Sequence, residues 1–198
     1  MLRFSFELVT CAASVDLLLL ALAEQLDEPD RKRVAQALPY RPALAYGAVR
    51  EGIGGLALRE YERANDVCFT FVFPPDSELV CYASEYEPPP TGGPIPVGCV
   101  YTKLHVGREH SLLTCTAATS SMSRVFERSP SVRDSWRNLA VTARSRALFF
   151  DAERDSVWDR LWPDPRTARR PELDAFSSED FAHLTDVDAY CDAALSEG

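Results

Sequence analysis

The segment 67–73 (Val-Cys-Phe-Thr-Phe-Val-Phe) most constrains the fold of this chain. Aromatic and β-branched residues favour strands, and this run contains little else. Phe69, Phe71 and Phe73 share one face, and the residues between them are also largely apolar. Both faces are therefore expected to be covered, as in a central strand. Because a strand needs neighbours, the chain must build a sheet.

A hairpin is predicted next to this strand, with strands over 98–106 and 109–118 joined at Gly107-Arg108. Gly-X is a two-residue turn that matches the twist of the flanking strands. This turn pairs His105 with His110 and places Tyr101 opposite Thr114, with Lys103 opposite Leu112. The other face then carries Val100, Leu104, Leu113 and Cys115.

Further elements follow from hydrophobic period and from cap signals. Strands are predicted at 2–8, 56–61, 79–86 and 146–150, the last of these ending the sheet. Helices are predicted at 15–23, 29–38, around Met122–Phe126, from Pro130 after the capping Ser129, over 157–162, and from Ser177 toward Leu195.

These elements indicate an α+β fold, a mainly antiparallel sheet with helices packed on one side. We expect an α+β domain over 1–163, followed by a linker rich in proline and an acidic C-terminal helical tail over 164–198.

The charge of the chain is unevenly distributed. Residues 1–150 hold 16 basic and 17 acidic side chains, whereas residues 151–198 hold 5 and 13, which gives the last quarter a net charge of −8 out of −9. Nucleic acid and anionic membranes need basic patches, so we expect neither as a partner. An acidic segment favours basic partners or solubility.

We expect a cytoplasmic protein without a membrane span. The most apolar stretch, 15–23, is shorter than the roughly 20 residues a span needs, and acidic rather than basic residues flank it. In a reducing compartment the six cysteines are predicted to be free, with Cys68, Cys81, Cys99 and Cys115 buried in apolar strands.

Several residue patterns in the sequence have some features of binding sites. The hairpin pair His105 and His110 offers two metal ligands, but Cys99 is the only nearby third ligand, so we predict no metal site and no cofactor. Gly52-Ile53-Gly54-Gly55 lacks the Lys-Ser/Thr ending of a phosphate loop. The loop Pro88–Pro94 is either a plain connector or a ligand for a proline-binding domain.

Two groups of residues have the side-chain types of a catalytic site. Ser120, Ser121 and Ser123 stand at a helix start, where serine mainly caps, and no nucleophile elbow precedes them. The carboxylates Asp151, Glu153, Asp155 and Asp159 suit a solvated helix face paired with arginines. We therefore expect a protein that is not an enzyme.

One part of the chain resembles a known class of proteins. After the hairpin come Ser121-Met122-Ser123-Arg124-Val125-Phe126, Ser129-Pro130-Ser131-Val132, Ala147–Asp151 and Leu161-Trp162-Pro163. This order of strands, two short helices, a strand and a Leu-Trp-Pro ending resembles the small immunity proteins of bacterial polymorphic toxin systems. The resemblance implies a non-enzymatic inhibitor that binds a basic toxin domain, and it assigns no role to any single residue.

Two sets of candidate residues follow. For a binding protein, the acidic C-terminal segment would steer a basic partner and nearby aromatic residues would anchor it if exposed, or complete the core if buried; this set is Trp158, Trp162, Glu179, Asp180, Asp186, Asp188, Tyr190 and Asp192. The alternative is a small enzyme or ligand-binding domain whose pocket involves Tyr101, His105 and His110. A third reading is an adaptor that uses the Pro88–Pro94 loop or the tail helix.

Overall fold

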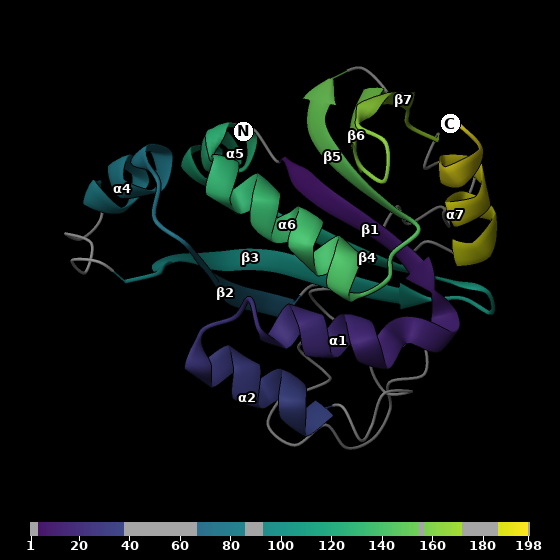
Figure 1. Ribbon diagram of the computed structural model, residues 1–198, viewed down its shortest axis with the longest axis horizontal. Helices are drawn as coiled ribbons and strands as arrows, with labels where there is room; N and C mark the ends of the chain where they lie inside the picture. The colour runs from purple at the N-terminus through teal and green to yellow at the C-terminus, as the bar shows by residue number, and fades with distance from the viewer. Residues whose placement is uncertain (1–3, 38–66, 86–92, 155–156, 172–185, 198) are drawn as a thin grey trace.

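The computed structural model describes residues 4–37, 67–85, 93–154, 157–171 and 186–197 (Figure 1). The strands are β1 (Ser5–Cys11), β2 (Val67–Phe73), β3 (Ile95–Val106), β4 (His110–Thr116), β5 (Ala147–Arg154), β6 (Val157–Trp162) and β7 (Arg166–Arg169). The helices are the short 3-10 turn η1 (Ala12–Ser14), α1 (Val15–Ala23), α2 (Glu28–Ala37), α4 (Ser77–Ser84), α5 (Ser120–Arg128), α6 (Pro130–Thr142) and α7 (Val187–Ser196).

The strands form one antiparallel sheet in the order β2-β3-β4-β1-β5-β6-β7. The predicted N-terminal strand, β1, therefore lies at its centre, where Leu8 pairs with Leu113 on one side and Leu148 on the other. The predicted α+β class with a mainly antiparallel sheet is confirmed.

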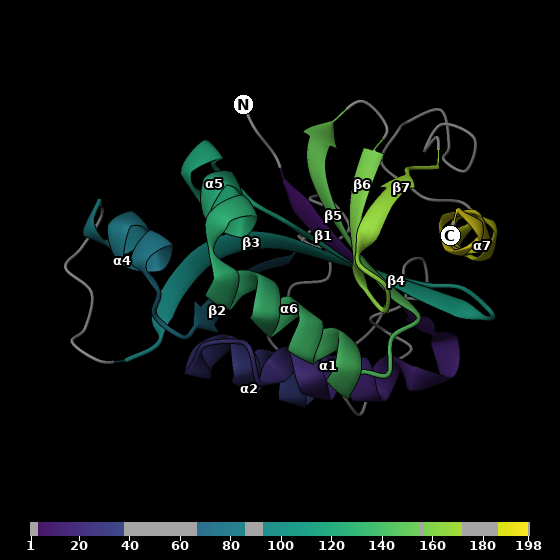
Figure 2. The same cartoon turned by 45° about the horizontal axis from the view of Figure 1, so that its top comes forward.

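One face of the sheet carries the larger core, under α1, α5 and α6 (Figure 2). Phe6 of β1 stacks on Trp136 of α6, with the ring centroids 4.8 Å apart, and Phe126 of α5 packs on the same phenyl ring. The predicted pair of helices is present as α5 and α6. The predicted cap is also confirmed, because the Ser129 hydroxyl accepts from the Val132 amide at 3.1 Å at the start of α6.

The opposite face carries a second core under α7. Val9, Phe149 and Trp158 of the sheet pack with Tyr190 and Cys191 of the helix. The helix lies at the end of the sheet where the tip of the β3–β4 hairpin also lies (Figures 1 and 2). The segment predicted as linker and tail thus supplies β7 and α7, which complete this second layer.

The hairpin forms as predicted, but its register is shifted by two residues. His105 pairs with Leu112, not His110, because the turn spans residues 107–109 and is closed by the Gly107 amide donating to the His110 carbonyl at 2.8 Å. Likewise Lys103 pairs with Thr114, and Tyr101 with Thr116. A shift of two residues preserves the face of every side chain. The predicted core face of Val100, Leu104, Leu113 and Cys115 is accordingly buried.

The prediction of a strand at 79–86 was wrong, because Ser77–Ser84 forms helix α4. Asp76 caps this helix by accepting from the Leu79 amide at 2.9 Å. Its second carboxylate oxygen accepts from the Ser129 hydroxyl at 2.6 Å and from the Ser131 amide at 3.0 Å, so one side chain joins the starts of α4 and α6.

The prediction of a helix at 157–162 was also wrong. This segment is β6, which continues the sheet beyond β5, so the strand at 147–154 is not the last. Consequently Asp151, Glu153 and Asp159 lie on strands rather than on a helix face. The predicted strand at 56–61, the glycine run at 52–55, Asp155 and most of the Pro88–Pro94 loop lie outside the described residues.

Strand β2 is an edge strand, not a central one: β3 is its one neighbouring strand within the described sheet, and on its other side Phe71 forms an isolated bridge with Leu26. Its Phe69, Phe71 and Phe73 are buried, but Cys68 on the other face is exposed. All six cysteines are free, as expected, yet Cys68, Cys81 and Cys99 are exposed and only Cys115 of the four discussed is buried. Among the described residues, the longest apolar helices fall short of what a bilayer crossing requires.

Candidate functional site

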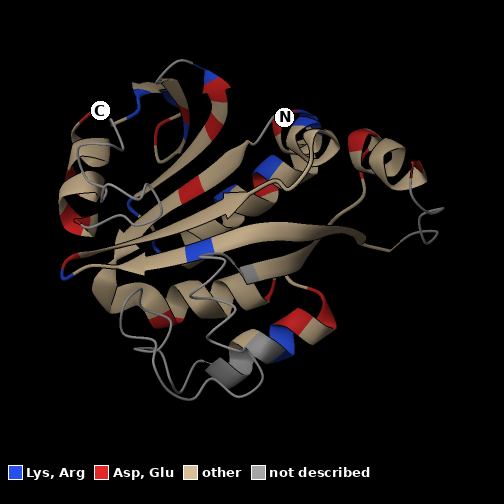
Figure 3. Ribbon diagram, turned by 180° about the vertical axis from the view of Figure 1, so that it is seen from behind, with Lys and Arg blue, Asp and Glu red and all other residues tan. Residues whose placement is uncertain are grey.

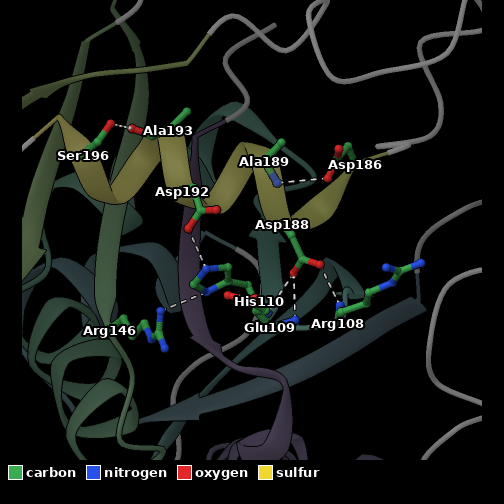
Figure 4. Close-up of polar contacts among 10 residues, drawn as sticks. All are labelled: Arg108, Glu109, His110, Arg146, Asp186, Asp188, Ala189, Asp192, Ala193 and Ser196. Atoms are coloured by element: carbon green, nitrogen blue, oxygen red, sulfur yellow. Dashed lines mark hydrogen bonds and ion pairs between the residues drawn. The ribbon is translucent and has the colours of Figure 1, made fainter.

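The acidic helix α7 and the β3–β4 hairpin, predicted as two alternative sites, lie against each other (Figure 4). The candidate site is therefore one junction, between the hairpin turn at 107–110 and the helix from Asp186 to Ser196 (Figure 4). Its polar contacts show which of the predicted residues hold the fold and which remain exposed.

Asp188 holds the hairpin turn. Its carboxylate accepts from the backbone amides of Arg108 at 2.8 Å, Glu109 at 3.0 Å and His110 at 2.9 Å (Figure 4). Burial alone would raise the pKa of Asp188, but these three donors outweigh it and lower the pKa below its usual value. A Cβ at Gly107 would clash with this carboxylate, which explains why glycine suits the turn.

His110 lies buried beneath α7, between Asp192 and Arg146. Its Nε2 is 2.9 Å from an Asp192 carboxylate oxygen, and its Nδ1 is 3.5 Å from Arg146 Nη1 (Figure 4). The buried His110 ring thus has a charged side chain beside each of its nitrogens, Asp192 at Nε2 and Arg146 at Nδ1.

The other two members of the predicted ligand site do not complete it. His105 is buried on β3, where burial and then the nearby Lys103 lower its pKa to about 4. A histidine with this pKa is neutral at physiological pH. Tyr101 is partly exposed, four residues along the strand from His105. Across the described segments, no group of three or more His, Cys, Asp or Glu side chains is placed to hold a metal ion.

The aromatic residues predicted as anchors are mostly internal. Trp158 and Tyr190 are buried in the second core and meet edge to face, with centroids 6.3 Å apart. Trp162 is half-buried against the first core, and its indole N–H donates to the Ser145 carbonyl at 3.4 Å. The expectation that such residues complete the core therefore holds for Trp158 and Tyr190.

Some acidic residues of the C-terminal segment hold the fold, and some of the acidic residues are exposed to solvent. Asp186 caps α7 by accepting from the Ala189 amide at 2.9 Å, and Asp188 holds the hairpin turn. Asp192 contacts His110 yet leaves 67% of its side chain exposed. Glu179 and Asp180 lie outside the described residues. Exposed acidic side chains around this junction are Glu109, Asp186, Asp192 and Glu197, and acidic residues are visible along α7 from behind (Figure 3).

A buried charge cluster under α7 was not predicted from the sequence. Arg170 donates to Glu7 Oε1 at 3.3 Å and also to a carboxylate oxygen of Asp151, while the Tyr190 hydroxyl donates to Glu7 Oε2 at 3.0 Å. Burial raises the pKa of Glu7, and Arg170 opposes that rise. Glu7 and Asp151 are buried on adjacent strands β1 and β5, so Arg170 supplies the positive charge between them.

This cluster does not resemble a catalytic pair of carboxylates. The Glu7 oxygens accept from Arg170 and Tyr190, whereas acid–base catalysis needs a carboxyl group that a substrate can reach. At the start of α5, the cap is Thr119 rather than one of the serines, and the buried Ser123 hydroxyl accepts from the Phe4 amide at 3.2 Å.

Comparisons with protein-family profiles, characterised proteins and solved structures found no match to this chain.

Proposed function

We propose that this protein is a non-enzymatic binding protein that neutralises a basic bacterial toxin domain in the cytoplasm, as an immunity protein does. The observation that carries the proposal is the group of exposed acidic side chains around the α7–hairpin junction, Glu109, Asp186, Asp192 and Glu197. Acidic groups on a fixed surface raise the association rate of a basic partner.

The anchoring of α7 supports this proposal. A surface that is already ordered loses less conformational entropy on binding than a segment that must fold on its partner. Asp188 fixes the helix to the hairpin turn, and Tyr190 and Cys191 fix it to the sheet. The exposed carboxylates are thereby presented on a preformed surface rather than on a loose tail.

The alternative of a ligand site at the hairpin is less well supported. Such a site would need the His110 ring, which is buried and has a charged side chain beside each of its nitrogens. The proposed interaction surface therefore includes the outer side of the junction but not the predicted anchors Trp158 and Tyr190.

The test is capture of the partner followed by a functional assay. Tagged protein is used to capture partners from a lysate of the source cells, and a captured basic protein is then expressed in a bacterial host with and without this chain. The proposal expects the partner to stop growth alone and co-expression to restore it. A captured partner that is harmless alone, or whose toxicity is unaffected, would refute the immunity role.

Matched variants test the surface in the same assay. Glu109→Lys with Glu197→Lys reverses two exposed charges at the junction, and Glu24→Lys with Glu85→Lys makes the same change in exposed residues at the ends of α1 and α4. Both pairs alter the net charge equally, so only position differs. The proposal expects the first pair to weaken growth rescue and the second to preserve it.

A further inference from the structure

Two exposed cysteines meet across the edge of the sheet. Cys68 lies on the edge strand β2 and Cys99 on its neighbour β3, with their sulfur atoms 3.2 Å apart. Directly opposed residues in this part of the ladder are Cys68 and Tyr101, so Cys99 is only a diagonal neighbour of Cys68. In a regular antiparallel pair, diagonal Cα atoms are about 7 to 8 Å apart, too far for a disulfide without backbone movement.

A β-bulge in β3 explains the close approach. Phe69 pairs with Val100 and Phe71 with Val97, so the single residue between the two phenylalanines faces both Gly98 and Cys99. Cys99 has a φ of 61°, in the left-handed region that residues other than glycine seldom occupy. The extra residue and this backbone conformation re-aim the Cys99 side chain toward Cys68.

We propose that Cys68 and Cys99 form a reversible redox pair, which closes to an intramolecular disulfide when a hydroperoxide or a small-molecule disulfide oxidises it. The sulfur atoms need to move only about 1 Å closer to reach bonding distance. Both thiols are exposed, so an oxidant reaches them without unfolding of the sheet.

The chemistry balances with either oxidant. One thiolate attacks the peroxide oxygen and breaks the O–O bond, giving a sulfenic acid and hydroxide; the second thiolate attacks that sulfur and expels a second hydroxide. Two thiols and one hydrogen peroxide thus give one disulfide and two waters, with two electrons passing from sulfur to oxygen. With glutathione disulfide, two successive exchanges release two glutathione molecules.

Three other cysteines differ from this pair in burial or in position. Burial raises the pKa of both the Cys115 and Cys191 thiols to about 12, so neither is a ready nucleophile. Cys81 is exposed on α4, a different element from the β2–β3 pair, and serves as an accessible internal reference.

Closure of the disulfide would tie β2 into the sheet. Within the described sheet, β3 is the one strand that neighbours β2. On the outer side of β2, the Asp27 amide donates to the Thr70 carbonyl at 3.0 Å and the Val72 amide donates to the Gln25 carbonyl at 2.8 Å. A disulfide would add a covalent tie on the side that faces β3. A covalent link between positions 68 and 99 closes a long loop, and such links restrict the unfolded chain. The redox state of the pair would therefore control how firmly this edge is held.

The test uses reduced full-length protein exposed to hydrogen peroxide, or to glutathione buffers of increasing oxidised fraction, and then alkylated with a maleimide. Intact mass spectrometry is expected to show two fewer adducts per oxidised molecule, and peptide mapping to show residues 68 and 99 joined. The variants Cys68→Ser and Cys99→Ser should lose this intramolecular link, while Cys81→Ser should form it like the wild type. Reduction with dithiothreitol should restore both adducts.

The proposal would be overturned by full alkylation of both thiols at oxidant levels that oxidise Cys81. A link between two molecules, or one involving a different cysteine, would overturn it equally. Circular dichroism of each serine variant confirms that loss of the link does not reflect loss of the fold, and these exposed positions tolerate serine without filling or emptying a core site.

Discussion

Replacement of Arg170 by methionine tests whether the C-terminal segment is part of the folded core. Methionine keeps an apolar stem but removes the charge that lies between Glu7 and Asp151. The side chains of these two acids are only 4% and 7% exposed. Their carboxylates would then face each other without a cation, an arrangement that costs about 3 to 5 kcal/mol when one partner of a buried pair is removed.

The lower end of this range applies here, because the Arg170 side chain is itself 26% exposed and solvent screens part of its charge. We therefore expect a loss of about 3 kcal/mol in the free energy of unfolding, or about 10 °C in Tm for a chain of this size. Urea denaturation followed by circular dichroism and by tryptophan fluorescence measures both the loss and the cooperativity of unfolding.

The loss in free energy of unfolding caused by Arg170→Met should become smaller as the pH falls. Burial already raises the pKa of Glu7, and without Arg170 that pKa rises further. A carboxyl group whose folded pKa is raised destabilises the protein above that pKa, and the penalty fades as pH falls and the group binds a proton. The difference in unfolding free energy between variant and wild type should therefore narrow as the pH falls from neutral toward the ordinary pKa of glutamate, about 4.3.

Two further variants make the result specific. Arg169→Met changes an exposed arginine beside it and should alter stability by no more than about 0.5 kcal/mol. Adding Glu7→Gln to Arg170→Met removes one buried charge, so the double variant should be more stable than additivity predicts by about 1 kcal/mol or more. Equal stability of the Arg170 and Arg169 variants at all pH values would refute the reasoning.

Three other perturbations probe separate contacts. Asp188→Ala removes three acceptor contacts from the hairpin turn and should cost about 2 kcal/mol, with faster hydrogen exchange of the turn amides measured by NMR; unchanged exchange would contradict the anchoring role. Asp76→Ala should also cost about 2 kcal/mol by calorimetry, because it removes the cap of α4 and the contact with Ser129, whereas an unchanged Tm would argue against this link. The imidazole NMR signals of His105 should stay those of a neutral ring down to about pH 4, and stability should fall as pH drops from 6.5 toward that value; titration near 6.5 would show that the ring is not buried.

The parts of the fold that follow from local signals were predictable. Strand β2, the helix pair α5 and α6, and the cap at Ser129 each depend on periodicity or on residues a few positions apart. Helix α4 was missed, although Asp76 followed by Leu79 three residues later is a cap signal of the same kind. The short apolar run at 79–83 fits the period of either a helix or a strand, and its closeness in sequence to β2 favoured the strand.

The candidate site depends on contacts that no local pattern reveals. Glu7 alternates with apolar residues in β1, a pattern that is typical of a solvent-facing position. It is buried because Arg170 and Tyr190, 163 and 183 residues away in sequence, supply its partners. The same applies to Asp188, whose acidity suggested steering of a partner, whereas its carboxylate closes a turn some 80 residues earlier. The number of charged residues can be read from a sequence. Whether a given charged side chain holds the fold or faces a partner depends on which elements the fold brings next to it.

The most direct test of the proposed function is the association rate constant with the captured partner, measured by stopped-flow fluorescence over a range of salt concentrations. The account predicts a rate that falls as salt increases, a rate about tenfold lower for the Glu109→Lys, Glu197→Lys protein at low salt, and an unchanged rate for the Glu24→Lys, Glu85→Lys protein. Equal rates for all three proteins, or rates insensitive to salt, would contradict a role for the acidic α7–hairpin junction in partner binding.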